Sequence, residues 1–129
     1  MLNDPLANVM SMILSNELIG KSELLVKPSS KIIKEVLRVM KDNGYIAEFK
    51  EVADSRGNYI RLTLNGSINK CGVIKPRYSV KNKEFEKFER RYLPAKDMGI
   101  LFVSTPNGIA THYDVKSKKT GGRLLAYCY

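Results

Sequence analysis

Two turns in the second half of the sequence hold residues whose types and spacing could do chemistry. Residues 104–108 read Ser-Thr-Pro-Asn-Gly and directly follow an apolar run at 99–103. Their hydroxyls, amide and glycine suit RNA, because small groups can hydrogen-bond 2′-hydroxyls and unstacked base edges while the backbone approaches closely. Residues 118–123 read Lys-Lys-Thr-Gly-Gly-Arg, and their cations suit phosphates. Pro-Asn-Gly is also common in ordinary hairpin turns, so the first turn needs support from the rest of the chain.

No catalytic constellation accompanies these turns. His112 lies close to Asp114, as a hydrolase would require, but no nucleophile or metal ligand has a matching spacing, and packing or capping at a helix start is the favoured role. Neither G-x-x-x-x-G-K nor G-x-G-x-x-G occurs. Cys71 and Cys128 lie far apart in the sequence, and we expect two buried thiols in a reducing compartment. The sequence therefore predicts no enzyme activity, no cofactor and no metal site.

The positive charge is concentrated in the second half of the chain. Residues 1–64 contain 9 Lys+Arg and 8 Asp+Glu, a net of +1, whereas residues 65–129 contain 13 and 5, a net of +8, which together give the +9 of the whole chain. Such an asymmetric field is typical of a protein that binds a polyanion. A membrane-surface protein would carry a basic amphipathic helix or a lipidation motif, and the sequence has neither. A soluble basic enzyme is the other class that charge alone leaves open.

Length and composition indicate one globular domain or two small modules. The chain has 129 residues, 43% of them hydrophobic, which excludes a disordered chain. No apolar run approaches the roughly 20 residues that cross a bilayer, and the start at Asp4-Pro5 lacks the basic segment of a signal peptide. We therefore expect a cytoplasmic protein with no membrane partner.

The first half predicts a helix–strand–helix–strand–strand module, residues 1–65. The expected elements are a helix from Asp4-Pro5 to about residue 20, a strand at 24–27, a helix from Ser29-Ser30 to Asn43-Gly44, and strands at 46–52 and 59–64. Their order indicates a small sheet with both helices packed on it.

The second half, residues 66–129, is basic, and its patterns predict both strands and helices. The expected elements are a helix with Phe85, Phe88 and Tyr92 on its core face, a strand at 99–103 that is buried on both faces, a short helix capped by Thr111 and ending near Lys119, and a strand at 123–129. In the last strand we expect Leu124, Ala126 and Cys128 on one face, and Leu125, Tyr127 and Tyr129 on the other. The predicted fold class is α/β, more strictly α+β.

An ordered series of short motifs runs nearly from end to end of the chain. The motifs are Asp4-Pro5-Leu6-Ala7, Lys27-Pro28-Ser29-Ser30-Lys31, Asp42-Asn43-Gly44-Tyr45-Ile46, Asn69-Lys70-Cys71-Gly72-Val73-Ile74 with Lys75-Pro76-Arg77, Val103-Ser104-Thr105 with Gly108, and Gly121-Gly122-Arg123. In this order they resemble the small-subunit ribosomal protein S8 family, in its archaeal and eukaryotic branch and most closely its archaeal members. Any one tetrapeptide is a weak signal, but the ordered series is specific.

The resemblance implies a structural constituent of the small ribosomal subunit, a ribosomal RNA-binding protein of translation rather than an enzyme. It implies two small α/β modules, the second of them mostly β with a short helix. It also implies primary binding of the 66–129 module to the central domain of small-subunit ribosomal RNA and secondary RNA contacts by the 1–65 module. The implied role is to organise the folding of this RNA during subunit assembly. We expect neighbouring small-subunit ribosomal proteins as partners, no small-molecule substrate, and a monomer outside the ribosome.

The RNA-binding residues combine those that the charge and turns indicate with those that the resemblance implies. They are Ser104, Thr105, Pro106, Asn107, Gly121, Gly122, Arg123, Lys118, Lys119, Lys75, Arg77 and Lys31, with Lys70 and Lys116 as further phosphate-binding cations. Lys31 is included because a cation in the first turn of a helix is unfavourable unless an anion lies nearby. The alternative function is a generic duplex-RNA-binding or nucleic-acid-binding protein without ribosomal specificity.

Overall fold

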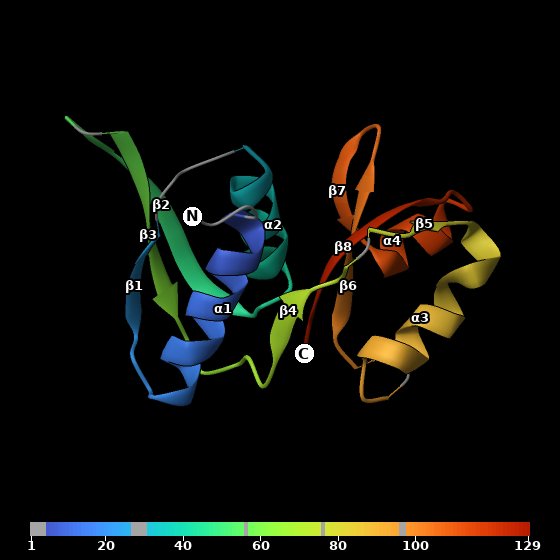
Figure 1. Ribbon diagram of the computed structural model, residues 1–129, viewed down its shortest axis with the longest axis horizontal. Helices are drawn as coiled ribbons and strands as arrows, with labels where there is room; N and C mark the ends of the chain where they lie inside the picture. The colour runs from blue at the N-terminus through green and yellow to red at the C-terminus, as the bar shows by residue number, and fades with distance from the viewer. Residues whose placement is uncertain (1–4, 27–30, 56, 76, 96–97) are drawn as a thin grey trace. The chain divides into compact units, whose positions relative to one another are not determined.

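The computed structural model describes residues 5–26, 31–55, 57–75, 77–95 and 98–129. Its contacts divide the chain into two compact units, Met1–Asn69 and Lys70–Tyr129, hereafter the first unit and the second unit (Figure 1). The predicted helix caps at Asp4 and Ser29-Ser30, and the predicted strand end at Lys27, lie outside the described residues.

The first unit has the helix–strand–helix–strand–strand order that the sequence predicts. Its elements are α1 (Pro5–Leu18), β1 (Glu23–Val26), α2 (Lys31–Asp42), β2 (Ile46–Asp54) and β3 (Gly57–Leu64). The strands form an antiparallel sheet in the order β1-β3-β2, and both helices lie against one face of it (Figure 1). Ile60 and Leu62 are buried while Arg61 between them is exposed, because successive residues of a strand point to opposite faces.

Glycine ends both helices of the first unit in the same way. Gly20 and Gly44 have φ angles of +78° and +80°. After α2 the Tyr45 N–H bonds the Met40 carbonyl at 2.9 Å, and Lys21 bonds back across the last turn of α1 in the same manner. This is the Schellman motif, in which the left-handed residue is usually glycine because it has no Cβ. The predicted end of the second helix at Gly44 is confirmed.

The second unit is a five-stranded sheet with short helices. Its elements are β4 (Cys71–Val73), β5 (Ser79–Val80), the 3₁₀ turn η1 (Asn82–Glu84), α3 (Phe85–Tyr92), β6 (Ile100–Thr105), β7 (Gly108–Thr111), α4 (His112–Ser117) and β8 (Gly122–Cys128). The sheet is antiparallel, with the order β4-β8-β6-β7. β5 also pairs with β8, at its first two residues, whereas β4 pairs with its last three. Figure 1 shows the β6–β7 hairpin extending from this sheet. Helices and antiparallel sheets in both units confirm the α+β class.

One apolar cluster joins the helices of the second unit to its sheet. Phe85 and Phe88 of α3, Val115 of α4 and Val103 of β6 are buried in it, and Tyr92 packs against it. The core role predicted for the three aromatic residues is therefore confirmed.

β8 breaks the alternation that the sequence predicts for residues 123–129. Ala126 and Leu124 pair with consecutive residues of β6, so Leu125 between them is the extra residue of a β-bulge. The bulge places Leu124 in the same apolar cluster as Tyr127, whereas the predicted alternation placed it on the face of Ala126. That prediction was wrong, because a bulge arises from the pairing of two strands and leaves no mark on the periodicity of one.

α4 begins where the sequence predicts and ends earlier. The Thr111 hydroxyl oxygen accepts from the Asp114 N–H at 3.3 Å, so Thr111 is the predicted N-cap. The helix ends at Ser117 rather than near Lys119. The two lysines that follow belong to a turn that leads into β8.

Candidate nucleic-acid interface

Three segments that are distant in the sequence meet at one end of the second unit's sheet. Arg123, near the start of β8, lies opposite Ser104 of β6 on one side and opposite Ser79 of β5 on the other. The turn that follows β6 and the turn that precedes β8 both open at this end. We call this region the sheet end, and it comprises residues 77–80, 104–108 and 118–123.

A serine–arginine–serine row crosses the sheet end. Val103 and Leu124 face the apolar cluster, so the next residue of β6, Ser104, and the residue before Leu124, Arg123, point to the opposite face. Arg123 and Ser79 are exposed and Ser104 is half-buried. Within the described residues neither serine hydroxyl has a hydrogen-bond partner, so each is available to a ligand. Ser79 is not among the residues predicted from the sequence, because only the pairing of β5 with β8 brings it beside Arg123.

Ser104 and Thr105 were predicted in a turn but are the last two residues of β6, and only Pro106 and Asn107 form the turn. The Thr105 side chain nevertheless holds the shape of this turn. The Thr105 hydroxyl donates to the Gly108 carbonyl over 2.7 Å, and Gly108 has a φ of +119°. Pro106 and Asn107 are exposed at the tip. A ligand can still donate to the Thr105 oxygen, but the Thr105 proton is engaged. Ser104 and Asn107 are therefore the better candidates for reading a ligand at this turn.

Gly121 and Gly122 are required by strand packing. A Cβ on Gly122 would lie 2.4 Å from the Val103 Cγ1 and 2.7 Å from the Ser104 carbonyl oxygen, and one on Gly121 would lie 2.5 Å from the Val80 carbonyl oxygen. All three distances are well below van der Waals contact. The two glycines therefore let β8 pass between β5 and β6, which positions Arg123 at the sheet end.

Lys119 has a strained backbone at the sheet end. Its φ is +55°, and the next N–H, that of Thr120, bonds the Val115 carbonyl at 3.1 Å. α4 thus ends in the Schellman motif of α1 and α2, with lysine where those helices have Gly20 and Gly44. A left-handed conformation costs a non-glycine residue about 1 kcal/mol. An exposed cation held in this conformation is consistent with an anion-binding role.

Lys75 and Arg77 lie in the segment that connects β4 to β5, and both of these strands pair with β8. The Ile74 N–H bonds the Leu125 carbonyl, and the Tyr78 carbonyl accepts from the Leu124 N–H, both at 2.9 Å. Ile74 and Tyr78 thus bond neighbouring residues of β8, and the exposed Lys75 and Arg77 belong to the segment between them.

Four of the expected cations, Lys31, Lys70, Lys75 and Lys116, are not among the residues that make up the sheet end. Lys31 is the exposed first residue of α2 and belongs to the first unit. Lys70 exchanges backbone hydrogen bonds with Tyr129, at the opposite end of β8 from Arg123. Lys116 is engaged within the protein, because its ammonium lies 2.7 Å from the Glu89 carboxylate. A phosphate contact by Lys116 would have to compete with this ion pair.

His112 is a structural residue. Its side chain is 1% exposed; Nδ1 accepts from the Leu101 N–H at 3.0 Å, and Nε2 lies 3.0 Å from the Glu89 carboxylate. A ring nitrogen that accepts a backbone N–H carries no proton, so Nε2 is the donor to Glu89. Neither nitrogen reaches the surface, which agrees with the packing role favoured for His112 over acid–base catalysis.

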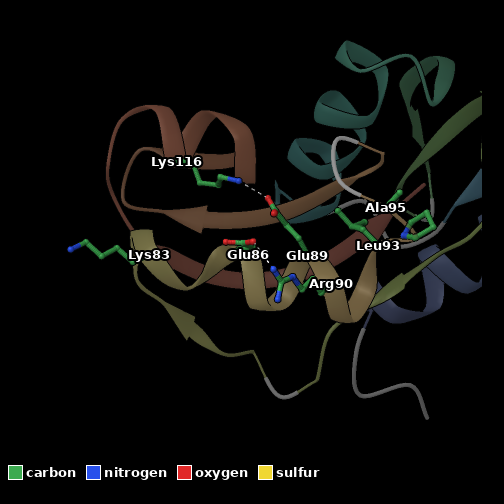
Figure 2. A pocket seen from close by; sticks show the side chains of 8 residues that line it. Lys83, Glu86, Glu89, Arg90, Leu93, Ala95 and Lys116 are labelled. Atoms are coloured by element: carbon green, nitrogen blue, oxygen red, sulfur yellow. Dashed lines mark hydrogen bonds and ion pairs between the residues drawn. The ribbon is translucent and has the colours of Figure 1, made fainter.

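A hollow of about 680 Å³ lies along α3 (Figure 2). Its lining consists of Lys83, Glu86, Glu89, Arg90, Leu93, Pro94, Ala95 and Lys116. Both of its carboxylates are paired: Glu86 lies 2.8 Å from Arg90, and Glu89 is bonded to Lys116. Figure 2 marks these pairs with dashed lines. The carboxylates of this hollow thus neutralise cations of the same wall.

The described residues lack both a metal-ligand cluster and a membrane-spanning helix. They contain no group of three or more histidine, cysteine or acidic side chains that could hold a metal ion. None of the helices formed by these residues is long and apolar enough to cross a membrane.

Exposed cations beside serine hydroxyls at the end of a sheet, in the basic half of the chain, are typical of a nucleic-acid-binding protein. The model of the ribosomal protein S8 family matches residues 4–129. The chain therefore belongs to the ribosomal protein S8 family, as the motif series indicated. It is a small-subunit ribosomal protein that binds ribosomal RNA, and this family is one of structural ribosomal proteins and not of enzymes.

Proposed function

We propose that this protein is a primary binder of the central domain of small-subunit ribosomal RNA and organises the folding of that RNA during subunit assembly. We place it in the archaeal and eukaryotic branch of the family, on the strength of Asn69–Ile74 and the adjoining Lys75-Pro76-Arg77. The observation that carries the proposal is the sheet end, where the Ser79–Arg123–Ser104 row meets the exposed Lys118 and Lys119.

The cations and the serine hydroxyls of the sheet end have different roles in RNA binding. Arg123, Lys118 and Lys119 attract any RNA backbone, and this contribution weakens as salt rises because bound counterions are released on association. The hydroxyls of Ser79 and Ser104 hydrogen-bond only when an RNA of the right geometry places a 2′-hydroxyl or base edge against them. Affinity therefore comes mainly from the cations and discrimination from the serines.

The two units have different roles in this proposal. The second unit makes the primary contact through the sheet end, and the first unit makes secondary contacts in which Lys31 neutralises a phosphate at the start of α2. The exposed position of Lys31 supports this role. The protein is a monomer before assembly and then acts at the cytoplasmic ribosome beside other small-subunit proteins.

Binding to two RNAs tests the proposal. The affinity for the central-domain stem is measured beside that for a regular hairpin of equal length, from low to high salt, with the unaltered protein and with Ser104→Ala. We expect the stem to be preferred at every salt concentration, and Ser104→Ala to reduce that preference roughly tenfold or less, as for one lost hydrogen bond. Ser11→Ala, an exposed serine of α1, is the matched control and should change nothing.

Thr105→Val is the less informative substitution at this turn, because it also removes the hydrogen bond to Gly108. Equal affinity for the stem and the hairpin would contradict the proposal. It would instead support the alternative, a generic duplex-RNA binder in which only the charge of the sheet end matters.

A further inference from the structure

The two cysteines of the chain lie directly opposite each other in the second unit. Cys71 of β4 and Cys128 of β8 are register partners. Next to them Lys70 and Tyr129 exchange both backbone hydrogen bonds, at 2.9 and 2.8 Å. Hydrogen-bonded and non-hydrogen-bonded pairs alternate along an antiparallel ladder, so Cys71 and Cys128 are a non-hydrogen-bonded pair.

This position brings the two thiols into reach of each other. Residues of a non-hydrogen-bonded pair have Cα atoms about 4.5 Å apart and side chains on the same face. A disulfide requires Cα atoms about 4.4–6.8 Å apart and side chains that point together. Both cysteines are in the thiol state, and both are buried. The pair therefore has the placement of a cross-strand disulfide and lacks only the bond.

We propose that Cys71 and Cys128 form a site of oxidative modification, at which a hydroperoxide converts the two thiols into an intrachain disulfide. The thiolate of one cysteine attacks the peroxide, the O–O bond breaks, and a sulfenic acid and water result in the case of hydrogen peroxide. The sulfur of the second cysteine then attacks the sulfenic sulfur and expels a second water. Two thiols and one peroxide thus give one disulfide and two waters, and the peroxide oxygens are reduced.

The position of β4 determines which thiol reacts first. β4 has three residues and is an edge strand of the sheet, whereas β8 lies between β4 and β6. Short edge strands open locally more readily than central ones. Cys71 is therefore the thiol that meets the peroxide, and Cys128 is the resolving thiol that attacks when β4 closes again.

The bond would connect the first strand of the second unit to its last. The closed loop contains residues 72–127, and a cross-link across a long loop restricts the unfolded chain strongly. We therefore expect oxidation to stabilise the second unit. The sheet end lies at the opposite end of β8 from Cys128, so RNA affinity should be unchanged and the inference stands apart from the proposed function.

The test treats the folded full-length protein with a small molar excess of hydrogen peroxide, and then denatures and alkylates it. The expected product has lost two hydrogen atoms, takes up no alkylating reagent, and yields a peptide pair that joins Cys71 to Cys128 and separates on reduction. Its urea midpoint should exceed that of the same sample after reduction, a comparison that needs no variant.

Cys128→Ser provides the matched control. In this variant, Cys71 should be recovered as a sulfenic acid or as an alkylated thiol. Peroxide treatment should not raise the urea midpoint of the variant. Full alkylation of both thiols in the treated wild-type protein would overturn the proposal. Disulfides that only join two chains, or sulfinic acid at Cys71 in place of a disulfide, would overturn it equally.

Discussion

The imidazole of His112 and the carboxylate of Glu89 meet in the interior of the second unit, with 3.0 Å between Nε2 and Oε1. The same carboxylate oxygen binds the Lys116 ammonium at 2.7 Å, and the other imidazole nitrogen binds the Leu101 N–H at 3.0 Å. α3, α4 and β6 are thus connected through one polar network. Leu101 is 0% exposed and Glu89 is 12% exposed, so loss of His112 removes the partner of a buried N–H and one partner of a poorly solvated carboxylate.

His112→Ala should lower the free energy of unfolding by about 2–4 kcal/mol, because it leaves the Leu101 N–H unpaired and opens a cavity. Urea denaturation of the variant measures this change. Ser117→Ala, at an exposed position of the same helix, should shift stability by less than about 0.5 kcal/mol. If His112→Ala were as stable as the unaltered protein, the network would have no structural importance, and a functional role for this histidine would have to be reconsidered.

Gly122→Ala should destabilise the second unit by about 1–3 kcal/mol, because the new methyl group meets the Val103 side chain and the Ser104 carbonyl. The comparison is Gly72→Ala, whose Cβ would lie 3.1 Å from the hydroxyl of Tyr127, the end of a side chain that can move. Thermal unfolding of both variants distinguishes the two situations. Equal small losses would show that β8 can shift away from β6, and that Gly122 is not required for packing.

Lys118→Ala and Lys116→Ala should differ in how they change RNA binding. Lys118 is exposed at the sheet end, so its removal should reduce the slope of log affinity against log salt by about one unit for any RNA. Lys116 is paired with Glu89, so its removal should leave that slope nearly unchanged and lower stability instead. Equal salt slopes of RNA affinity for the two variants would contradict the expectation that Lys118 binds RNA while Lys116 is held by Glu89.

Lys50→Glu should stabilise the first unit. Lys50 of β2 lies directly opposite Arg61 of β3, both are exposed, and within the described residues neither has an ion-pair partner. Like charges at such positions repel, so an opposite charge should add roughly 0.2–1 kcal/mol to the free energy of unfolding, less at high salt. Lys21→Glu changes the net charge equally and serves as control. A gain of the same size in both variants would indicate a general charge effect in place of the cross-strand pair.

The first unit could be predicted from the sequence far better than the sheet end. Its element order follows from local signals, such as the apolar spacing of α1 and the Asn43-Gly44 helix end, and each was read correctly. Features of the second unit that depend on strand pairing were not predictable. Ser79 beside Arg123 and the bulge at Leu125 exist only because particular strands are neighbours. The motif series indicated the family. The geometry then showed that Thr105 and Lys116 are engaged within the protein and added Ser79 to the candidate RNA-binding residues.

Lys119→Gly should raise the stability of the second unit and lower its affinity for RNA. Lys119 has a φ of +55° at the position where α1 and α2 have glycine, so glycine should relieve the left-handed strain and stabilise the second unit by up to about 1 kcal/mol. The same change removes a cation, and RNA affinity should fall with a smaller salt slope. Gly44→Lys is the reciprocal control, since a Cβ there meets no atom within 4 Å and only the backbone strain changes. It should destabilise the first unit by a similar amount. A Lys119→Gly variant that is more stable and binds RNA as well as before would show that the strained lysine has no role in binding.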